Sequence, residues 1–193
     1  INCYSTLTGF KHIANLIKNK KNEKFIAGGE ESYGYLVGDF VRDKDAIIST
    51  SILCEIANWA KMESKNLIDI LNEIYIKYGI FKDKLYTIKL EGIKGRENIQ
   101  KIMNEFRTNP PNLIFNMKTK KIIDYLNYNN KIKNEKADVI QILSDNDSSI
   151  TVRPSGTEPK IKFYFSLNSK KLNHKKMEEL IDKEIDIIKK KYV

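Results

Sequence analysis

The stretch TVRPSGTEPKIKFYF, residues 151–165, places a short polar loop between two strand-like runs. The first run ends at Arg153 and the second begins at Lys160, after which apolar and polar residues alternate as in a half-buried strand. Two extended runs joined by a short connection predict an antiparallel hairpin. The connection carries two hydroxyls and a glycine between two prolines, and an arginine precedes it. A plain turn does not require that chemistry.

The segments around this hairpin predict an α+β domain over residues 84–193. The runs ADVIQIL and SSITVR read as two further strands, joined by the turn sequence SDNDS. Apolar residues at helical spacing predict one helix that ends before Pro110 and Pro111 and another that Asn173 caps. We therefore expect a mainly antiparallel sheet with two packed helices. The apolar helix positions are Ile99, Ile102, Met103 and Phe106, then Met177, Leu180, Ile181, Ile185, Ile188 and Tyr192.

Residues 1–83 carry the pattern of part of an α/β domain. The apolar run at residues 25–27 meets Gly28 and Gly29, which predicts a buried strand entering a loop. Asp45 is placed to cap a helix. A second helix is expected between Ser64, as its cap, and Gly79, as its end. The two apolar faces are Ile48, Ile52, Ile56 and Trp59 or Ala60, then Leu67, Ile70, Leu71, Ile74, Tyr75 and Tyr78.

The periodicity changes from helix to strand near Asp83, and we place the domain boundary there. The chain has 193 residues, which allows one or two domains, and 41% of them are hydrophobic. It begins with Ile1, and the simplest interpretation is a piece of a longer protein. Sequence alone gives no apolar run of the ~20 residues that a membrane helix needs, and no targeting segment.

The net charge of +9 raises nucleic acid or an anionic small ligand as a partner. The lysines are interleaved with acids, and residues 170–193 hold eight lysines against five acidic residues. Such a pattern is typical of a solvated helix face. Cys3 and Cys54 are isolated, which favours a reducing cytoplasm and structural thiols.

Four short segments carry side chains suited to ligand chemistry. In RPSGTEPK, Arg153 offers a bidentate fork, Ser155 and Thr157 add hydroxyl donors, and Gly156 permits a positive φ that lets backbone N–H groups converge on an anion. The alternative is a turn shaped by proline and glycine with an incidental arginine. The residues alone leave both open.

In GGEESYG, Glu30, Ser32 and Glu31 are suited to sugar hydroxyls, and a solvated loop is the alternative. In VRDKDA, Lys44 between two aspartates is a candidate acid/base group or phosphate contact, or else a surface lysine beside a helix cap. In LTGFKH, residues 8–11 form a small loop that is a weak candidate on its own. No pair of histidines has a metal-binding spacing, and SDNDSS lacks the glycine and glutamate that a calcium loop needs.

Taken together, GEESYGYLVGDFVRDKDA and RPSGTEPKIKFY resemble the phosphoglucomutase/phosphomannomutase family, the α-D-phosphohexomutases, and TLTGFK does so too. The resemblance spans nearly the whole chain but covers only the last two of the family's four domains. It implies that residues 1–83 are the later part of the sugar-binding third domain. Residues 84–193 would be the phosphate-binding fourth domain. The loops that bear the family's phosphoserine and Mg²⁺ ligands have no counterpart in these residues.

The resemblance also implies roles for individual residues. Gly29, Glu30, Glu31 and Ser32 match the sugar-binding loop, and Thr8, Gly9, Phe10 and Lys11 match a loop that helps to select the sugar. In RDKD, Arg42 and Lys44 match family positions, with Arg42 as a substrate-binding residue and Lys44 as the candidate catalytic proton-transfer residue. The phosphate-binding loop corresponds to Arg153, Ser155, Gly156 and Thr157.

As a full-length protein, such an enzyme interconverts hexose 1-phosphate and hexose 6-phosphate through a hexose 1,6-bisphosphate. The resemblance implies Mg²⁺, held elsewhere in the enzyme, and glucose 1,6-bisphosphate as activator, with no metal site in this chain. It implies a cytoplasmic enzyme that acts on a hexose phosphate, with the missing N-terminal domains as partners and neither nucleic acid nor membrane. This part alone is expected to be inactive. The rivals are mannose or amino-sugar phosphate as substrate, and a non-catalytic basic module that binds nucleic acid or protein.

Overall fold

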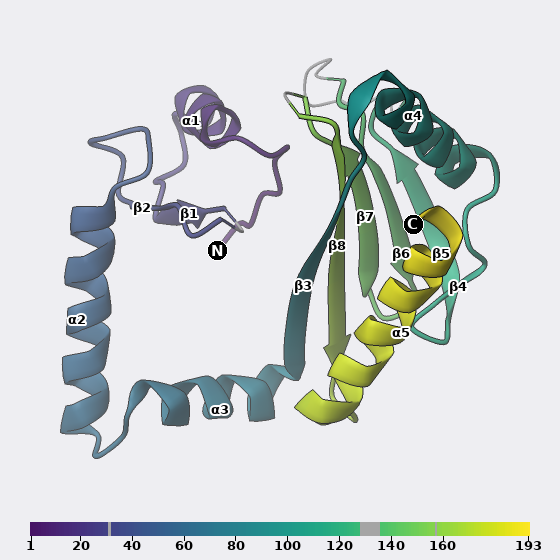
Figure 1. Ribbon diagram of the computed structural model, residues 1–193. Coiled ribbons are helices and arrows are strands. Elements are labelled where there is room, and N and C mark those ends of the chain that lie inside the picture. Colours follow the sequence, from purple (N-terminus) through teal and green to yellow (C-terminus); the bar gives the residue numbers. More distant parts are fainter. Residues whose placement is uncertain (31, 128–135, 157) are drawn as a thin grey trace. The chain divides into compact units, whose positions relative to one another are not determined.

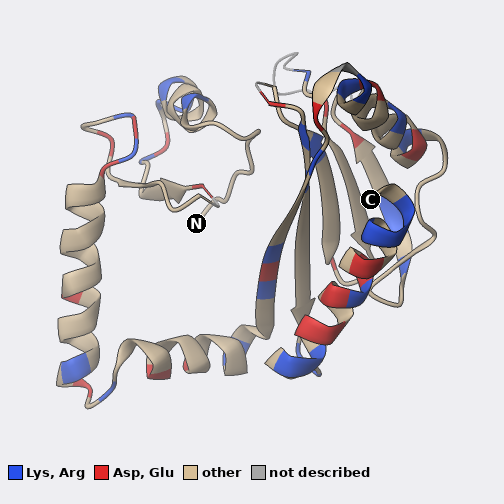
Figure 2. Ribbon diagram, viewed as in Figure 1, with Lys and Arg blue, Asp and Glu red and all other residues tan. Residues whose placement is uncertain are grey.

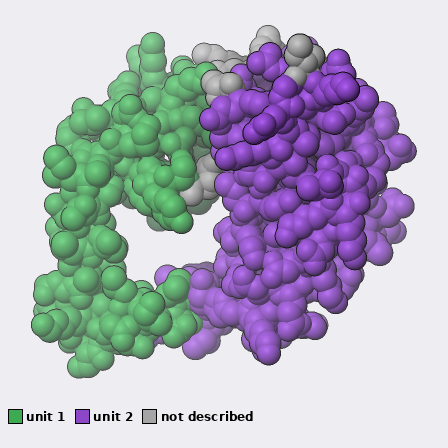
Figure 3. All heavy atoms as spheres, in the orientation of Figure 1, with its two compact units in different colours: residues 1–72 green, residues 73–193 purple. Residues whose placement is uncertain are grey.

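The computed structural model describes residues 1–30, 32–127, 136–156 and 158–193. The chain forms two compact units, residues Ile1–Asn72 and Glu73–Val193 (Figure 3). The division falls inside the helix α3, Leu67–Tyr78. Across the described ranges, no helix combines the length and the apolar character needed to span a bilayer.

The first unit contains two helices and a small hairpin, followed by the start of α3 (Figure 1). The helix α1, Phe10–Asn19, precedes the strands β1, Ala27–Gly29, and β2, Tyr35–Val37. These strands pair antiparallel with Gly28 opposite Leu36, and α2 follows as Ala46–Met62. The sequence did not reveal α1, because Phe10 and Lys11 were assigned to a loop and instead form its first turn.

The prediction of a buried strand in this unit is wrong. The strand begins only at Ala27, both Ala27 and Gly29 are exposed, and Gly28 is half-buried. Ile26, just before it, is also exposed. The reason is that β1 is three residues long and pairs with β2 alone in this sheet, so little protein covers its faces.

Local chemistry decides where α2 and α3 begin and end. The Asp45 carboxylate accepts from the backbone N–H groups of Ile47 and Ile48, which confirms the predicted cap. Ser64 does not cap α3. With φ of 57°, it occupies the left-handed residue that closes α2, where its N–H donates to the Lys61 carbonyl.

Asn66 caps α3 instead of Ser64. Its Oδ1 accepts from the N–H groups of Ile68 and Asp69, while Asp69 accepts from the Asn66 N–H. This reciprocal pair satisfies both ends of the first turn in the manner of a capping box. At the other end, Gly79 adopts φ of 100° directly after Tyr78, as predicted.

The apolar face of α2 is less covered than its periodicity predicts. Ala60 is buried, Ile48 and Ile52 are half-buried, and Ile56 and Trp59 remain 40% and 51% exposed. Within this unit α2 packs mainly against β2. The pattern identifies an apolar face correctly, but the described residues of this unit do not bury it.

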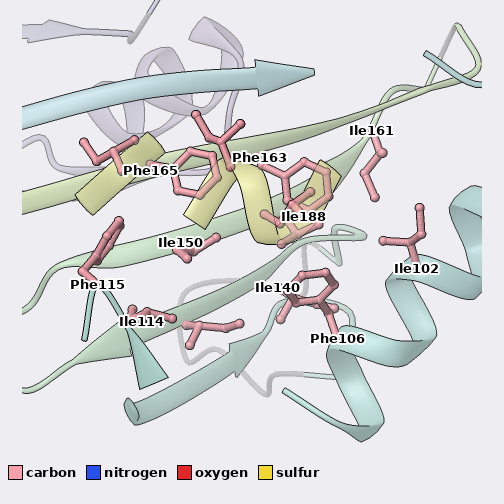
Figure 4. Close-up of a cluster of buried hydrophobic side chains, with 14 of the residues drawn as sticks. Ile102, Phe106, Ile114, Phe115, Ile140, Ile150, Ile161, Phe163, Phe165 and Ile188 are labelled. Atoms are coloured by element: carbon pink, nitrogen blue, oxygen red, sulfur yellow. The ribbon is translucent and has the colours of Figure 1, made fainter. Parts of the chain in front are cut away.

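The second unit is an α+β domain with one antiparallel sheet in the order β3-β8-β7-β6-β5-β4. Its strands are β3 Ile80–Lys89, β4 Leu113–Ile114, β5 Met117–Asp124, β6 Ile140–Ser144, β7 Ser149–Pro154 and β8 Lys160–Ser169. The helices α4, Gly92–Thr108, and α5, His174–Tyr192, both contribute side chains to the core on one face of this sheet (Figure 4). The predicted fold class is therefore confirmed.

Residues from both helices and the sheet form a single core. Phe163 and Phe165 of β8 lie at its centre with Phe106 of α4 and Ile188 of α5 around them (Figure 4). All the predicted apolar positions of α4 are buried, and those of α5 are buried except Tyr192, which packs at the margin. Asn173 caps α5 by accepting from the Lys176 N–H, as expected.

The sheet is larger than the sequence analysis indicated. β3 starts at Ile80, so Asp83 lies within a continuous strand. The domain boundary near residue 83 stays a prediction. The hairpin of β4 and β5 was not anticipated, because lysines fill much of β5. Its two-residue turn is formed by Phe115 and Asn116, with φ of 52° and 60°.

Charged side chains join α5 to the sheet. Lys82 of β3 pairs with Glu178, and Lys84 lies 2.6 Å from the Asp182 carboxylate. Acidic and basic residues are interleaved along α5, as the sequence predicts for a solvated face (Figure 2). Lysines of α5 and of β3 therefore have acidic neighbours on the same surface.

Glu184 of α5 gives a testable consequence of this packing. Its carboxylate accepts from the Phe115 N–H at 2.6 Å, and burial raises its pKa. Because the folded state holds the Glu184 proton more tightly, stability should fall as pH rises from about 4.5 towards neutrality. Glu184→Gln should remove this slope and keep the hydrogen bond, whereas Glu184→Leu should lose about 1–3 kcal/mol. Urea denaturation at pH 5 and pH 7 measures both.

Glu178→Gln is a matched control from the same helix. Lys82 lowers the pKa of Glu178, so this carboxylate should favour stability at higher pH and lose that contribution on acidification. That loss occurs below about pH 4.5, so Glu178→Gln should leave the slope between pH 5 and pH 7 as in the parent, whereas Glu184→Gln should remove it. Equal slopes in both variants would contradict the assignment.

Candidate functional site

The GGEESYG segment forms the tight connection between β1 and β2. The Glu30 N–H donates to the Gly34 carbonyl at 2.9 Å, which closes the turn. Gly34 is buried, and a Cβ there would lie 2.4 Å from Cδ of Lys44. Ser32 is exposed at the tip, and Glu31 lies outside the described residues. A side chain at position 34 would therefore displace Lys44 from its place against the turn.

A hydrogen bond joins this turn to the Thr8–Gly9 loop. Oε1 of Glu30 accepts from the Gly9 N–H at 3.1 Å. Thr8, Gly9, Gly29 and Glu30 share a small hollow of about 110 Å³. The structure thus brings together two segments that are 21 residues apart. Lys11 lies on α1 with an exposed side chain.

Lys44 lies against the same group of residues. Its aliphatic chain covers Gly34, its ammonium lies 5.2 Å from the centre of the Phe10 ring, and its Nζ is 2.9 Å from the Asp43 carboxylate. The hydrogen bond to Asp43 raises the pKa of Lys44, and the charge of Glu30 adds to the effect. The geometry therefore stabilises the protonated lysine, a cation that gives up its proton less readily than a free lysine does. Arg42 is exposed nearby in sequence.

The RPSGTEPK segment is the predicted connection between β7 and β8. Pro154 pairs with Ile161, the Ser155 N–H donates to the Lys160 carbonyl at 2.8 Å, and the Glu158 N–H points to Oγ of Ser155 at 3.4 Å. Gly156 does not adopt the left-handed backbone that the sequence analysis allowed for, and a Cβ there would meet no heavy atom within 4 Å. Thr157 lies outside the described residues.

Three lysines beside this loop were not identified from the sequence. Arg153 lies directly opposite Lys162, and Lys160 directly opposite Lys89 of β3. Because Ile161 and Phe163 point into the core, the alternating Lys160 and Lys162 lie on the other face of the sheet. The alternation KIK at residues 160–162 could have placed Lys160 and Lys162 on one face of the strand. The position of Lys89 beside Lys160 could not have been found in this way, because it depends on pairing between strands far apart in the sequence.

This arrangement concentrates positive charge at one end of the sheet. Lys160 pairs with Glu158 and lowers the pKa of that carboxyl, and the charges of Lys89 and Lys162 contribute to the shift. Like charges placed directly opposite each other on a sheet disfavour folding. An anion bound at the loop would offset this repulsion.

A metal ion has no evident site on the described part of the chain. Within those residues, no group of three His, Cys, Asp or Glu side chains is arranged to hold one. The Mg²⁺ that the resemblance implies therefore does not fit the side chains described here, and no chemical step is assigned to it.

Comparison with known sequences identifies two family regions. Residues 1–78 match the model described as phosphoglucomutase/phosphomannomutase, alpha/beta/alpha domain III, and residues 115–190 match the C-terminal domain of the same family. The phosphoglucomutases of Staphylococcus aureus strains N315 and USA300 are each 42% identical over 171 residues. Each alignment covers 83% of this chain and 31% of the relative. The chain thus spans 31% of the length of these relatives.

A solved structure shares the fold. The open form of the Paramecium exocytosis-sensitive phosphoprotein pp63/parafusin, a phosphoglucomutase, aligns with a TM-score of 0.64 at 21% identity. The alignment covers 94% of this chain and 31% of that one. At this identity the likeness concerns the arrangement of helices and strands.

The contact between Lys44 and Asp43 can be tested directly. Asp43→Asn should lower the pKa of Lys44 towards its ordinary value of 10.5, because the charged acceptor is lost. An NMR titration of the lysine side-chain resonances measures this change. Glu23→Gln is the control, since Glu23 raises the pKa of Lys20 in a separate cluster. It should shift Lys20 and leave Lys44 unchanged; an unaltered Lys44 in Asp43→Asn would show that the contact is absent.

Proposed function

Because the chain belongs to the phosphoglucomutase/phosphomannomutase family, we propose that it supplies the sugar-binding and phosphate-binding parts of a phosphohexomutase. The full-length enzyme would interconvert hexose 1-phosphate and hexose 6-phosphate through a hexose 1,6-bisphosphate. The observation that carries the proposal is the Arg153 loop, whose arginine and serine lie at the cationic end of the sheet.

Arg153, Ser155, Gly156 and Thr157 are proposed to bind the phosphate that is not reacting. The arginine offers two parallel N–H donors, and the unfilled space beside Gly156 leaves room for an anion to approach the backbone. Lys162 faces Arg153 across the strand pair and adds charge without a fixed geometry. Phosphoryl transfer depends mainly on positioning and on stabilisation of charge, which such a loop would provide.

Glu30, Ser32 and Glu31 are proposed to bind sugar hydroxyls, with Gly29 shaping the loop. The free carboxylate oxygen of Glu30 is available as an acceptor, because the Gly9 N–H occupies Oε1. Thr8, Gly9 and Lys11 would contact the sugar from the segment that precedes β1. Arg42 would contact it from the segment that follows β2. The hydrogen bond between Glu30 and Gly9 supports a single site formed by both segments.

Lys44 is proposed as the catalytic acid that protonates the leaving oxygen of the sugar. A lysine ammonium already carries the proton that a donor requires at neutral pH. The contact with Asp43 raises the pKa of Lys44, so the proton is released less readily while that contact holds. The same cation would stabilise negative charge on the transferring group. The phosphoserine, the Mg²⁺ ligands and the enclosing domains are expected from other parts of a cytoplasmic enzyme activated by glucose 1,6-bisphosphate.

The alternatives differ in substrate and in class. A mannose or amino-sugar phosphate would use the same phosphate loop, and GEES with RDKD favours glucose by resemblance. A basic module for nucleic acid or protein would rely on the net charge of +9. The interleaving of acids with the lysines favours the enzyme. Activity of the full-length protein on glucose 1-phosphate and mannose 1-phosphate distinguishes them.

Arg153→Ala tests the phosphate loop. In the full-length enzyme, loss of a charge-assisted contact of about 1.5–3 kcal/mol should weaken binding of glucose 1,6-bisphosphate by more than tenfold. Isothermal titration calorimetry measures the affinity. The exposed Arg96 of α4 provides a matched control, and Arg96→Ala should bind as the parent does. Equal affinity for both variants would remove Arg153 from the site.

Substitutions of Lys44 separate proton transfer from charge. Lys44→Ala in the full-length enzyme should lower kcat far more than it raises KM, by roughly the 10²–10⁴-fold typical of a general acid. Lys44→Arg keeps the positive charge but cannot readily give up its proton. We expect kcat to remain low in this variant. Recovery of turnover with arginine would assign Lys44 an electrostatic role alone, and the exposed Lys61→Ala serves as the control.

A further inference from the structure

Tyr33 has an unusual backbone conformation for a bulky residue. Its φ is 65°, in the left-handed region, where a side chain larger than that of glycine or asparagine is strained. Its side chain is 86% exposed, so packing within the described structure does not offset that strain. Strain of this kind persists where the surrounding structure imposes it, and it is concentrated at functional sites.

The other positive-φ residues with side chains have structural explanations. Ser64 closes α2, and Asp147 belongs to the turn after β6, where its N–H donates to the Ser144 carbonyl. Phe115 and Asn116 form the two-residue turn between β4 and β5. Phe115, the other bulky residue, is only 2% exposed and contacts the Phe165 ring. Ser64, Asn116 and Asp147 are exposed as well, but their side chains are small. Among the described residues, Tyr33 is therefore the bulky side chain that combines positive φ with exposure.

The turn fixes the position of Tyr33. The Glu30 N–H donates to the Gly34 carbonyl, and Lys44 packs closely on Gly34. Tyr33 lies between the exposed Ser32 and this buried glycine. The phenol ring is therefore presented from the same five-residue turn that carries Glu30 and Ser32, the residues proposed to bind the sugar.

We propose that Tyr33 is a further substrate-binding residue, whose ring contacts the carbon-bound hydrogens of the hexose. The inference rests on the proposed function of this turn as the sugar-binding loop. A hexose has polar hydroxyls at its rim and C–H groups on its faces. Carboxylates and hydroxyls recognise the rim, while an aromatic face, which is electron-rich, suits the C–H groups. Neither Glu30 nor Ser32 can make that second type of contact.

The proposed reaction adds a reason for an aromatic contact. A bisphosphate that exchanges its two ends must be bound in two orientations. Hydrogen bonds are directional and must be matched in each orientation, whereas dispersion contact with a flat ring depends little on which end of the sugar faces it. A strained tyrosine at the tip of the turn would be retained because it contacts the sugar in both orientations of the bisphosphate.

The experiment uses the full-length enzyme with Tyr33→Gly and Tyr33→Asn. Both replacements tolerate positive φ and remove the ring. We expect the melting temperature of the ligand-free enzyme to be equal or higher, and kcat/KM for hexose phosphate to fall roughly three- to tenfold, mainly through KM. Tyr33→Phe should retain kcat/KM, because it keeps the ring. Ser64→Gly, which relieves left-handed strain at a residue outside the site, should leave kcat/KM unchanged.

Two results would overturn the inference. One is an unchanged kcat/KM in Tyr33→Gly and Tyr33→Asn. The other is a marked fall in the melting temperature of the ligand-free enzyme, which would show that the ring packs against protein. Glu30→Gln distinguishes these results from failure of the proposed function. If Glu30→Gln reduces kcat/KM and the Tyr33 variants do not, only Tyr33 is excluded, whereas an inert Glu30→Gln would exclude the sugar-binding role of the whole turn.

Discussion

The alternation of side chains along β8 is the constraint on which the second unit depends. Ile161, Phe163, Phe165 and Leu167 point into the core, and the residues between them point away from it. β8 pairs with β3 over ten positions and with β7 over six. A slip of one residue would expose the four apolar side chains and bury the lysines. Hydrophobic burial therefore also fixes the face on which Lys160 and Lys162 lie beside Arg153.

The parts of the fold that follow from short-range chemistry could be predicted from the sequence. Asp45, Asn173 and Gly79 act within a few residues of their position, and the apolar periods of α4 and α5 match the core they form. The cap at Asn66 was missed because Ser64 is locally as good a candidate. Ser64 adopts the left-handed conformation that closes α2, and the cap of α3 therefore falls to Asn66. β5 was missed because its lysines hide the alternation, and β4 because it is only two residues long.

The candidate site was predictable as a set of loops and not as an arrangement. Sequence motifs indicate Glu30, Gly9, Lys44 and Arg153 individually. That Glu30 accepts from Gly9, or that Lys44 covers Gly34, depends on contacts between segments distant in the chain. The pairing of Lys89 with Lys160 is of the same kind, since it follows from the register of β3 on β8. At Gly156 the sequence permits a positive φ, but the backbone does not adopt one.

The two loops offer different kinds of recognition, and the difference suits the proposed ligand. A phosphate presents equivalent oxygens in several directions, so a loop with an arginine and neighbouring lysines would be able to hold either phosphate of a bisphosphate without detailed matching. Sugar hydroxyls point in fixed directions, so Glu30 needs a defined position, which the Gly9 N–H and the buried Gly34 provide. Strain and close packing are accordingly found at the turn after β1, where orientation matters. Repulsion between like charges is found at the loop after β7, where a bound anion would relieve it.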